Sequence, residues 1–303
     1  MLDGLASLSP LAGGHSGRTF VGEAGGERVV VRIYEPDDPA PEKDAAVLAL
    51  VRGLVPVADV LEVRRGDADH GQPGVLVTSW LTGERGDLAL DRLDAEARER
   101  MGRSMGSVAG TLAGMPCLRP GPFLDADLSL GRFPDGGLVE WTQARLGGAP
   151  AGDSPAWPEA ELARLVEVCR PAEDLLDTVG RACVVHSDLN PKNVLVDPAT
   201  GEVIGVVDWE LAHAGHPWTD LGNLLRFERD ADHVGAVLTG WSEQRGGHPV
   251  KDAVELLDGA RAADLWALVD LAAREGENPV ADRAANLLRA IAGTGDLHAW
   301  PEA

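Results

Sequence analysis

The 303-residue sequence is poor in the residues that several classes of protein require. Its cysteines are odd in number, widely spaced and without a Cys-x-x-Cys pair, so a disulfide framework is not expected. Basic residues number 27 against 49 acidic ones, and the net charge of −22 argues against nucleic-acid binding. No apolar run approaches the roughly 18 residues of a membrane span, and residues 1–10 lack the basic start of a secretory signal. We therefore expect a cytoplasmic protein that binds neither nucleic acid nor a membrane.

What is present is the composition of a soluble globular protein, with 44% apolar and 25% charged residues. At roughly 150 residues per domain, the length predicts two units. Residues 1–82 have the pattern of a small sheet with one helix, and residues 83–303 have longer, helical periods. We therefore place the boundary between the two units after residue 82.

The expected elements follow from turn residues and from apolar periodicity. Gly25-Gly26 separates two β-rich runs and predicts a tight hairpin. Pro41 suits the first turn of a helix, so the first unit should contain strands at 19–24, 27–34 and 75–80 and a helix over 41–52. In the second unit, residues 116–158 are rich in glycine and proline and are expected to be irregular. Helices are predicted at 94–113, 159–179, 220–245, 251–274 and 279–292.

One segment of the second unit combines polar residues with two short apolar runs. Residues 186–193 read His-Ser-Asp-Leu-Asn-Pro-Lys-Asn, and the apolar runs that follow are separated by a turn containing proline and glycine. This pattern predicts an antiparallel hairpin. Asn193 immediately precedes its first strand and Asp208 immediately follows its second, so both should lie at the same end, roughly 5 Å apart at the backbone. Asp188 lies on the loop that leads to this end.

Two carboxylates and an amide oxygen at one point suit Mg²⁺, which prefers oxygen ligands. Phosphoryl transfer needs such a metal, together with a carboxylate that accepts a proton from the attacking hydroxyl. We therefore expect Asn193 and Asp208 to bind the metal and Asp188 to act as the base. Any one of these residues on its own is equally explained as a turn former or a helix cap.

The segment that begins at His186 resembles the catalytic loop of the protein-kinase-like superfamily. The ending Asp208-Trp209-Glu210 is similar to the aminoglycoside phosphotransferase and choline-kinase branch, and not to the Asp-Phe-Gly of protein kinases. Residues 214–221, which include Asp220, resemble a further segment of that branch. The resemblance implies an α+β, two-lobed protein-kinase-like fold in which His186 and Asp220 support the catalytic loop. It also implies a nucleoside triphosphate, ATP or GTP, as co-substrate.

The same resemblance implies the residues of the nucleotide site in the first lobe. Arg32 stands where the family has a strand lysine that binds the phosphates, and it is expected to pair with Asp44 or with Glu42. The glycine-rich stretch before residue 18 occupies the place of the loop that covers the phosphates, and the stretch 78–81 falls where the family's hinge contacts adenine. These two stretches add Ser16, Gly17, Ser79 and Leu81 to the expected nucleotide contacts.

The acceptor is the least determined part of the prediction. Residues 186–303 contain 9 basic and 20 acidic residues, which is half of the total net charge, and the family builds its acceptor site in this half. An acidic cleft attracts cations, so an aminoglycoside or a basic peptide antibiotic is the predicted acceptor, with Glu210, Asp230 and Asp232 as contacts and antibiotic resistance as the outcome. A metabolic kinase for choline, an amino sugar or a fructosamine would use the same site. A nucleotide-binding scaffold without turnover is the alternative from another class, and the chain is expected to be a monomer or a homodimer.

Overall fold

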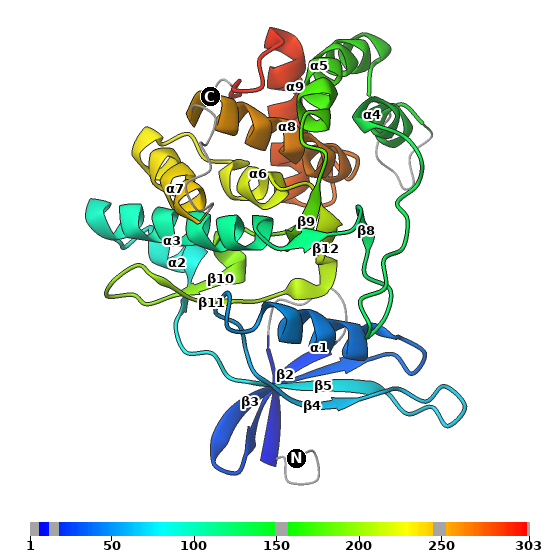
Figure 1. Cartoon of the computed structure of the whole chain (residues 1–303), viewed down its shortest axis with the longest axis vertical. Helices are drawn as coiled ribbons and strands as arrows, with labels where there is room; N and C mark the ends of the chain where they lie inside the picture. The colour runs from blue at the N-terminus through cyan, green and yellow to red at the C-terminus, as the bar shows by residue number, and fades with distance from the viewer. Residues whose placement is uncertain (1–5, 12–17, 149–156, 245–252, 302–303) are drawn as a thin grey trace.

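The computed structural model describes residues 6–11, 18–148, 157–244 and 253–301 (Figure 1). Its N-terminal part is a five-stranded antiparallel sheet in the order β1-β2-β3-β5-β4, and a single helix, α1, lies between this sheet and the helical remainder of the chain. The elements of this part are β1 Ala6–Pro10, β2 Arg18–Ala24, β3 Glu27–Tyr34, α1 Ala40–Val51, β4 Val60–Arg64 and β5 Gly74–Ser79.

The predicted hairpin forms at Gly25-Gly26. Both glycines have positive φ angles, 62° and 86°, which match the type I′ geometry that tight hairpins favour. Ala24 pairs with Glu27 across the turn, so the loop has two residues. The strands β1 and β4 were not predicted: β1 lies before the glycine-rich stretch, and β4 is a half-exposed strand next to β5.

Alternation along β3 decides which side chains face the rest of the molecule. Val29 and Val31 are buried against β5 on one face of the sheet. Because successive side chains of a strand point to opposite faces, Arg32 and Tyr34 lie on the other face, toward α1. The strand therefore brings Arg32 to the cleft between the sheet and the helical part.

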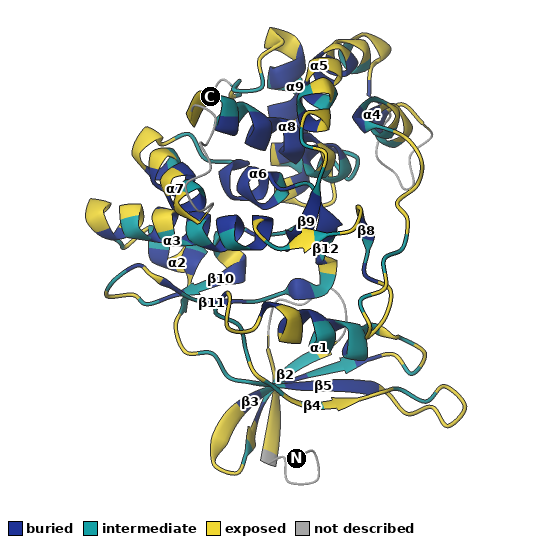
Figure 2. Cartoon of the chain, in the orientation of Figure 1, coloured by how far each residue is buried: buried dark blue, intermediate teal, exposed yellow. Residues whose placement is uncertain are grey.

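The remainder of the chain is mainly helical and contains most of the core (Figure 2). Its helices are α2 Gly86–Leu90, α3 Ala95–Ala113, α4 Leu138–Leu146, α5 Glu159–Asp177, α6 Thr219–Leu225, α7 Ala231–Glu243, α8 Ala253–Ala272 and α9 Pro279–Thr294. Short strands and 3₁₀ turns are inserted among them: β6 Glu84–Arg85, β7 Pro116–Cys117, β8 Gly121–Pro122, β9 Ala182–Val185, η2 Pro191–Asn193, β10 Val194–Val196, β11 Val203–Val206, η3 Trp209–Leu211 and β12 His213–Gly215.

Two predictions about this part were wrong. The single helix expected over 220–245 is two helices, α6 and α7, and Asp230 caps the second by accepting the backbone N–H of His233 at 2.9 Å. The stretch 116–158, expected to be irregular, contains α4 as well as β7 and β8. The N-terminal turn of α4 is stabilised by a residue far away in the sequence, because the Glu173 carboxylate on α5 accepts the N–H of Leu138 at 3.1 Å.

Helices α3 and α7 pack closely because α3 presents a row of glycines to its neighbour. Gly102, Gly106 and Gly110 are four residues apart and therefore lie on one face. A Cβ added at Gly106 would lie 2.0 Å from the carbonyl oxygen of Val237 on α7, so only glycine allows this approach. The contact anchors α7 on the helical part of the fold.

We expect Gly106→Ala to lower the free energy of unfolding by about 1–3 kcal/mol, because the added methyl group forces α3 and α7 apart. Gly235→Ala is the matched control: Gly235 is exposed on α7, and nothing lies within 4 Å of an added Cβ there. This second change should raise stability by up to about 1 kcal/mol through helix propensity. Urea unfolding of both variants measures the difference, and equal effects would contradict the packing argument.

Candidate active site

The hairpin of β10 and β11 brings the two ends of the predicted motif together. Val194 pairs with Val206, and the N–H of Val207 donates to the carbonyl of Asn193 at 2.9 Å. Asn193 and Asp208 therefore lie side by side at one end of the hairpin, as the order of strands and turn predicts. Both residues line the large cleft, of about 2760 Å³, between the sheet and the helices.

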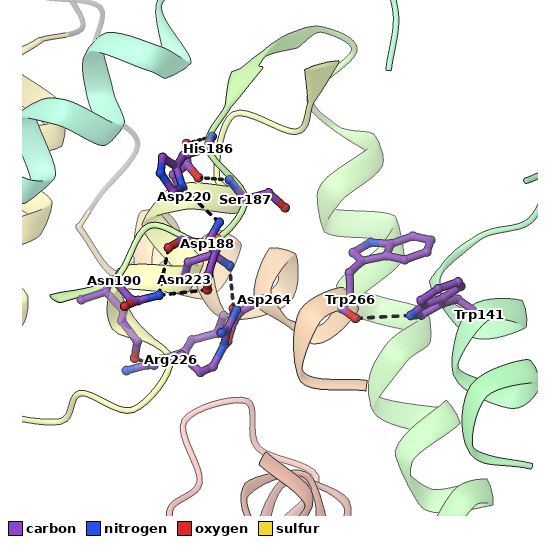
Figure 3. Close-up of polar contacts among 12 residues, drawn as sticks. Trp141, His186, Ser187, Asp188, Asn190, Asp220, Asn223, Arg226, Asp264 and Trp266 are labelled. Atoms are coloured by element: carbon purple, nitrogen blue, oxygen red, sulfur yellow. Dashed lines mark hydrogen bonds and ion pairs between the residues drawn. The ribbon is translucent and has the colours of Figure 1, made fainter. Parts of the chain in front are cut away.

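Asp188 lies at the same place and is held by two amide side chains (Figure 3). Asn190 Nδ2 donates to one carboxylate oxygen at 2.9 Å, and Asn193 Nδ2 donates to the other at 2.8 Å. Each amide also donates to the Asp188 carbonyl, at 2.9 Å. The carboxylate of Asp188 consequently has a defined orientation, and a quarter of its side chain remains exposed to the cleft.

The loop that carries Asp188 is held in place by Asp220 and His186 (Figure 3). The two Asp220 oxygens accept the backbone N–H groups of His186 at 2.9 Å and Ser187 at 2.8 Å. The His186 ring is fully buried, and burial lowers its pKa, so the ring is neutral. Its Nε2 lies 2.9 Å from the Val207 carbonyl and its Nδ1 accepts the N–H of Asp188, which ties the loop to the hairpin.

The backbone at Asp208 adopts a conformation that few residues other than glycine occupy. Its φ and ψ are 66° and 59°, in the left-handed region, which aspartate tolerates better than most residues. Burial raises the pKa of Asp208, and the nearby carboxylate of Glu210 raises it further. Negative charge therefore accumulates at this end of the hairpin.

Arg32, on strand β3 of the sheet, lies close to these carboxylates. Its guanidinium forms a close ion pair with Glu210 and lies 4.0 Å from an oxygen of Asp44 and 4.0 Å from an oxygen of Asp208. Of the two expected helix partners, Asp44 is the one near Arg32, whereas Glu42 pairs with Arg65 at 3.6 Å. Asp44 also accepts the Tyr34 hydroxyl at 2.9 Å.

The structure shows Glu210 engaged in this ion pair, and its expected contact with the acceptor stays a prediction. The side chain turns toward the sheet because the Arg32 guanidinium on β3 attracts its carboxylate. Sequence reasoning could not detect this pairing, since the two residues are 178 positions apart. In this structure Glu210 therefore faces the β3 side of the cleft.

The remaining expected nucleotide contacts are only in part within the described residues. Ser79 and Leu81 line the cleft where the sheet joins the helical part. The Ser79 N–H donates to the Asp59 carbonyl at 2.9 Å, and the hydroxyl accepts the Asp59 N–H at the same distance. Ser16 and Gly17 lie outside the residues that the structure describes.

Two other expected acceptor contacts lie away from the cleft. Asp230 is used as the cap of α7, and Asp232 is exposed in the first turn of the same helix. Among the helices that line the cleft, α4, α6 with the residue after it, and α8 contribute residues that the sequence did not single out: Trp141, Asn223, Arg226 and Trp266. No local motif marks these positions, because they converge from three separate helices.

Comparison with known proteins agrees with this geometry. The model of the phosphotransferase enzyme family matches residues 7–257, which is most of the chain. The chain belongs to that family. The resemblance inferred from the catalytic loop is thereby confirmed, and the protein is a phosphotransferase by family.

Solved structures show that this phosphotransferase has the two-lobed fold of its family. A thermostable mutant of aminoglycoside phosphotransferase APH(4)-Ia, in complex with ADP and hygromycin B, superposes with a TM-score of 0.65 at 17% identity, covering 96% of this chain and 95% of that one. The GDP complex of aminoglycoside 2′-phosphotransferase-IIIa gives 0.63 at 15% identity, covering 96% and 94%. A putative aminoglycoside phosphotransferase from Ralstonia eutropha gives 0.63 at 19%, covering 96% and 91%. The predicted fold class is confirmed.

A shorter match comes from curated proteins. The mouse acyl-CoA dehydrogenase family member 11 is 42% identical to this phosphotransferase over 55 residues, and the rat protein is 41% identical over 54. Each match covers 18% of this chain and 7% of the relative. The phosphotransferase thus matches only a small part of these longer proteins.

In the described part of the chain, no helix is long and apolar enough to cross a membrane.

His216, near the catalytic loop, makes stability depend on pH. Burial lowers its pKa to about 4, and its Nδ1 accepts the backbone N–H of Trp218 at 3.2 Å, which a protonated ring could not do. The unfolded chain has the ordinary histidine pKa of about 6.5. Between these two values the unfolded state therefore binds more protons, and folding is weakened as the pH falls.

We expect His216→Gln to reduce the loss of stability between pH 6.5 and pH 4, where His216 alone contributes up to about 3 kcal/mol. Urea unfolding at half-unit pH intervals gives the free energy of unfolding as a function of pH, and its slope is the quantity to compare. Equal slopes for wild type and His216→Gln would contradict the assignment.

Proposed function

We propose that this phosphotransferase moves the γ-phosphoryl group of a nucleoside triphosphate, ATP or GTP, to a hydroxyl of a small-molecule acceptor. The observation that carries the proposal is the arrangement of Asp188. Its carboxylate is oriented by Asn190 and Asn193, faces the cleft and lies at the end of the hairpin where Asp208 also lies. A carboxylate placed in this way can orient the attacking hydroxyl and accept its proton.

The residues at the end of the hairpin fit Mg²⁺. Asn193 uses its Nδ2 to hold Asp188, which leaves its amide oxygen as a ligand. The pKa of Asp208 is raised by burial and by the charge of Glu210, and a divalent cation would offset this crowding of negative charge. When bound, Mg²⁺ neutralises charge on the phosphates. We therefore assign Asn193 and Asp208 as the residues that would hold it.

The other residues of the cleft orient the reactants. Arg32 is permanently charged and can bind two phosphate oxygens once they displace Glu210. Asp44 accepts the Tyr34 hydroxyl and helps to orient the Arg32 guanidinium, 4.0 Å away. Ser79 and Leu81 provide backbone groups for a purine. His186 and Asp220 keep the loop in place through backbone hydrogen bonds, and they take no part in proton transfer.

For the acceptor we propose an aminoglycoside or a basic peptide antibiotic, so that phosphorylation would confer resistance. The structural neighbours support an acceptor of this kind, since one of them holds hygromycin B together with ADP. A metabolic kinase acting on choline, an amino sugar or a fructosamine is the second candidate. A coupled assay of nucleoside diphosphate release, run over both groups of compounds, distinguishes them.

Asp188→Asn is expected to lower kcat about 10²–10⁴-fold, because general-base catalysis typically contributes that factor. Nucleotide affinity should be retained, since the asparagine side chain keeps the size of the aspartate. Asp230→Asn is the control, because asparagine also caps helices well and Asp230 lies away from the cleft. Full turnover in folded Asp188→Asn would refute the role of this carboxylate.

Asp208→Asn should weaken nucleotide binding in the presence of Mg²⁺ and leave it unweakened in the presence of EDTA. The physical reason is that the carboxylate attracts the cation but repels the phosphates when the cation is absent. Isothermal titration calorimetry with and without Mg²⁺ measures both affinities. If the substitution affects the two affinities equally, Asp208 does not act through a metal.

A further inference from the structure

The far wall of the cleft is formed largely by one face of α8. Ala263, Trp266, Ala267 and Asp270 all line the cleft, and their spacing of three and four residues places them on a single helical stripe. The two alanines are small and leave the indole of Trp266 accessible, with 37% of the residue exposed. An exposed tryptophan between alanines is an open apolar surface inside the cleft.

Trp266 is held in position by a second tryptophan. The ring centroids of Trp141 on α4 and Trp266 lie 5.9 Å apart with the planes inclined by 42°, and Trp141 Nε1 donates to the Trp266 carbonyl at 3.3 Å (Figure 3). Arg145 lies over the Trp141 ring, 5.2 Å from its centroid, and forms an ion pair with Asp270. The tryptophan pair is therefore oriented before any ligand binds.

Two carboxylates of α8, Asp264 and Asp270, form ion pairs with arginines of the same protein. Asp270 pairs with Arg145 and also with Arg274, at 3.5 Å. Deeper in the helices, Asp264 accepts three hydrogen bonds of 2.8–3.0 Å from the Arg226 guanidinium. Half of the net negative charge lies in residues 186–303, but the two α8 carboxylates of this region, Asp264 and Asp270, already have arginine partners. The wall is suited to select an acceptor by shape and hydrogen bonding.

Asn223 on α6 lines the cleft, and its amide oxygen has no hydrogen-bond donor among the described residues. Its side chain is buried, with 3% of the residue exposed, and its Nδ2 donates to Asp264 at 3.2 Å. Because a carboxylate can only accept, this bond fixes which end of the amide is the oxygen. The buried Oδ1 has no hydrogen-bond partner among the described residues. Buried acceptor atoms usually have a donor. Asn223 lines the cleft, and a donor from the cleft reaches this atom when the Asn223 side chain turns toward it.

We propose that the Trp141–Trp266 pair and Asn223 are the acceptor-binding residues of this phosphotransferase. The acceptor they take is a cyclic, hydroxylated molecule, which lays an apolar ring face on the indoles and donates a hydroxyl or amino hydrogen to Asn223 Oδ1. This recognition rests on the proposed function, because the acceptor must also bring a hydroxyl to Asp188. In this proposal, ring stacking and a hydrogen bond determine which acceptor binds, and the attraction of cations to an acidic surface does not.

The test begins with a panel of two kinds of compound. Hygromycin B and glucosamine are cyclic and hydroxylated, whereas choline and spermine are acyclic cations. We expect the cyclic compounds to bind, to quench tryptophan fluorescence and to include the acceptor that is phosphorylated. Binding should change little between 0.1 M and 1 M NaCl, although the Debye length falls from about 10 Å to about 3 Å, because ring stacking is not screened. Preferential binding of spermine with a steep salt dependence would overturn the proposal.

Variants then test the named residues on whichever panel member is phosphorylated best. Trp266→Ala should raise the acceptor KM by roughly tenfold or more, whereas Trp266→Phe keeps an aromatic face and should retain most of the affinity. Asn223→Leu, which is similar in size but has no oxygen, should also raise the acceptor KM. The nucleotide KM should stay constant in all three variants. Trp300→Ala is the control, since Trp300 is 42% exposed and does not line the main cleft.

The outcomes separate this inference from the proposed function. If a panel member is phosphorylated and Trp266→Ala leaves its KM unchanged, the inference is wrong and the proposed function stands. If cyclic compounds bind and quench in wild type but not in Trp266→Ala, and none is phosphorylated, the site is supported and the assignment of Asp188 fails. If no cyclic member binds, the inference is overturned. Thermal unfolding of each variant shows whether it is folded.

Discussion

The active site depends on one buried carboxylate. Asp220 accepts two consecutive backbone N–H groups, those of His186 and Ser187, and Ser187 has a φ of 71°, a conformation that a free chain seldom adopts. Hydrogen bonds to a charged acceptor are among the stronger ones in proteins. Burial raises the pKa of Asp220, and these two hydrogen bonds act in the opposite direction. The backbone position of Asp188 follows from this contact, and Asn190 and Asn193 then orient its carboxylate.

Much of the site could be predicted because its parts are local. The two-residue turn at Gly25-Gly26 and the hairpin between Asn193 and Asp208 each depend on residues close together in the chain, so turn chemistry and strand alternation were sufficient to place them. Within such short segments, the positions of polar residues before and after a strand already determine which side chains meet. The relation of Asn193 to Asp208 is the clearest case.

What could not be predicted depends on contacts between distant segments. Glu210 turns toward Arg32 because the lobes meet there, and nothing near Glu210 in the sequence indicates it. Helix α4 was missed because the acid that completes its first turn, Glu173, lies on α5. Likewise, Trp266 looks like an ordinary core residue until α4 and α8 are placed side by side. In each case tertiary structure supplies the partner that the local pattern lacks.

The presence of arginine on β3 has a consequence for chemical modification of the nucleotide site. The first 82 residues contain a single lysine, Lys43, and its ammonium group already lies 3.5 Å from Asp44 and 3.4 Å from the Glu210 carbonyl. Reagents that acylate amines therefore find no target on the strand that faces the phosphates, since a guanidinium stays protonated at any physiological pH. An amine-directed covalent inhibitor of this cleft would instead have to reach Lys192, which lies off that strand, lines the cleft and has 54% of its side chain exposed.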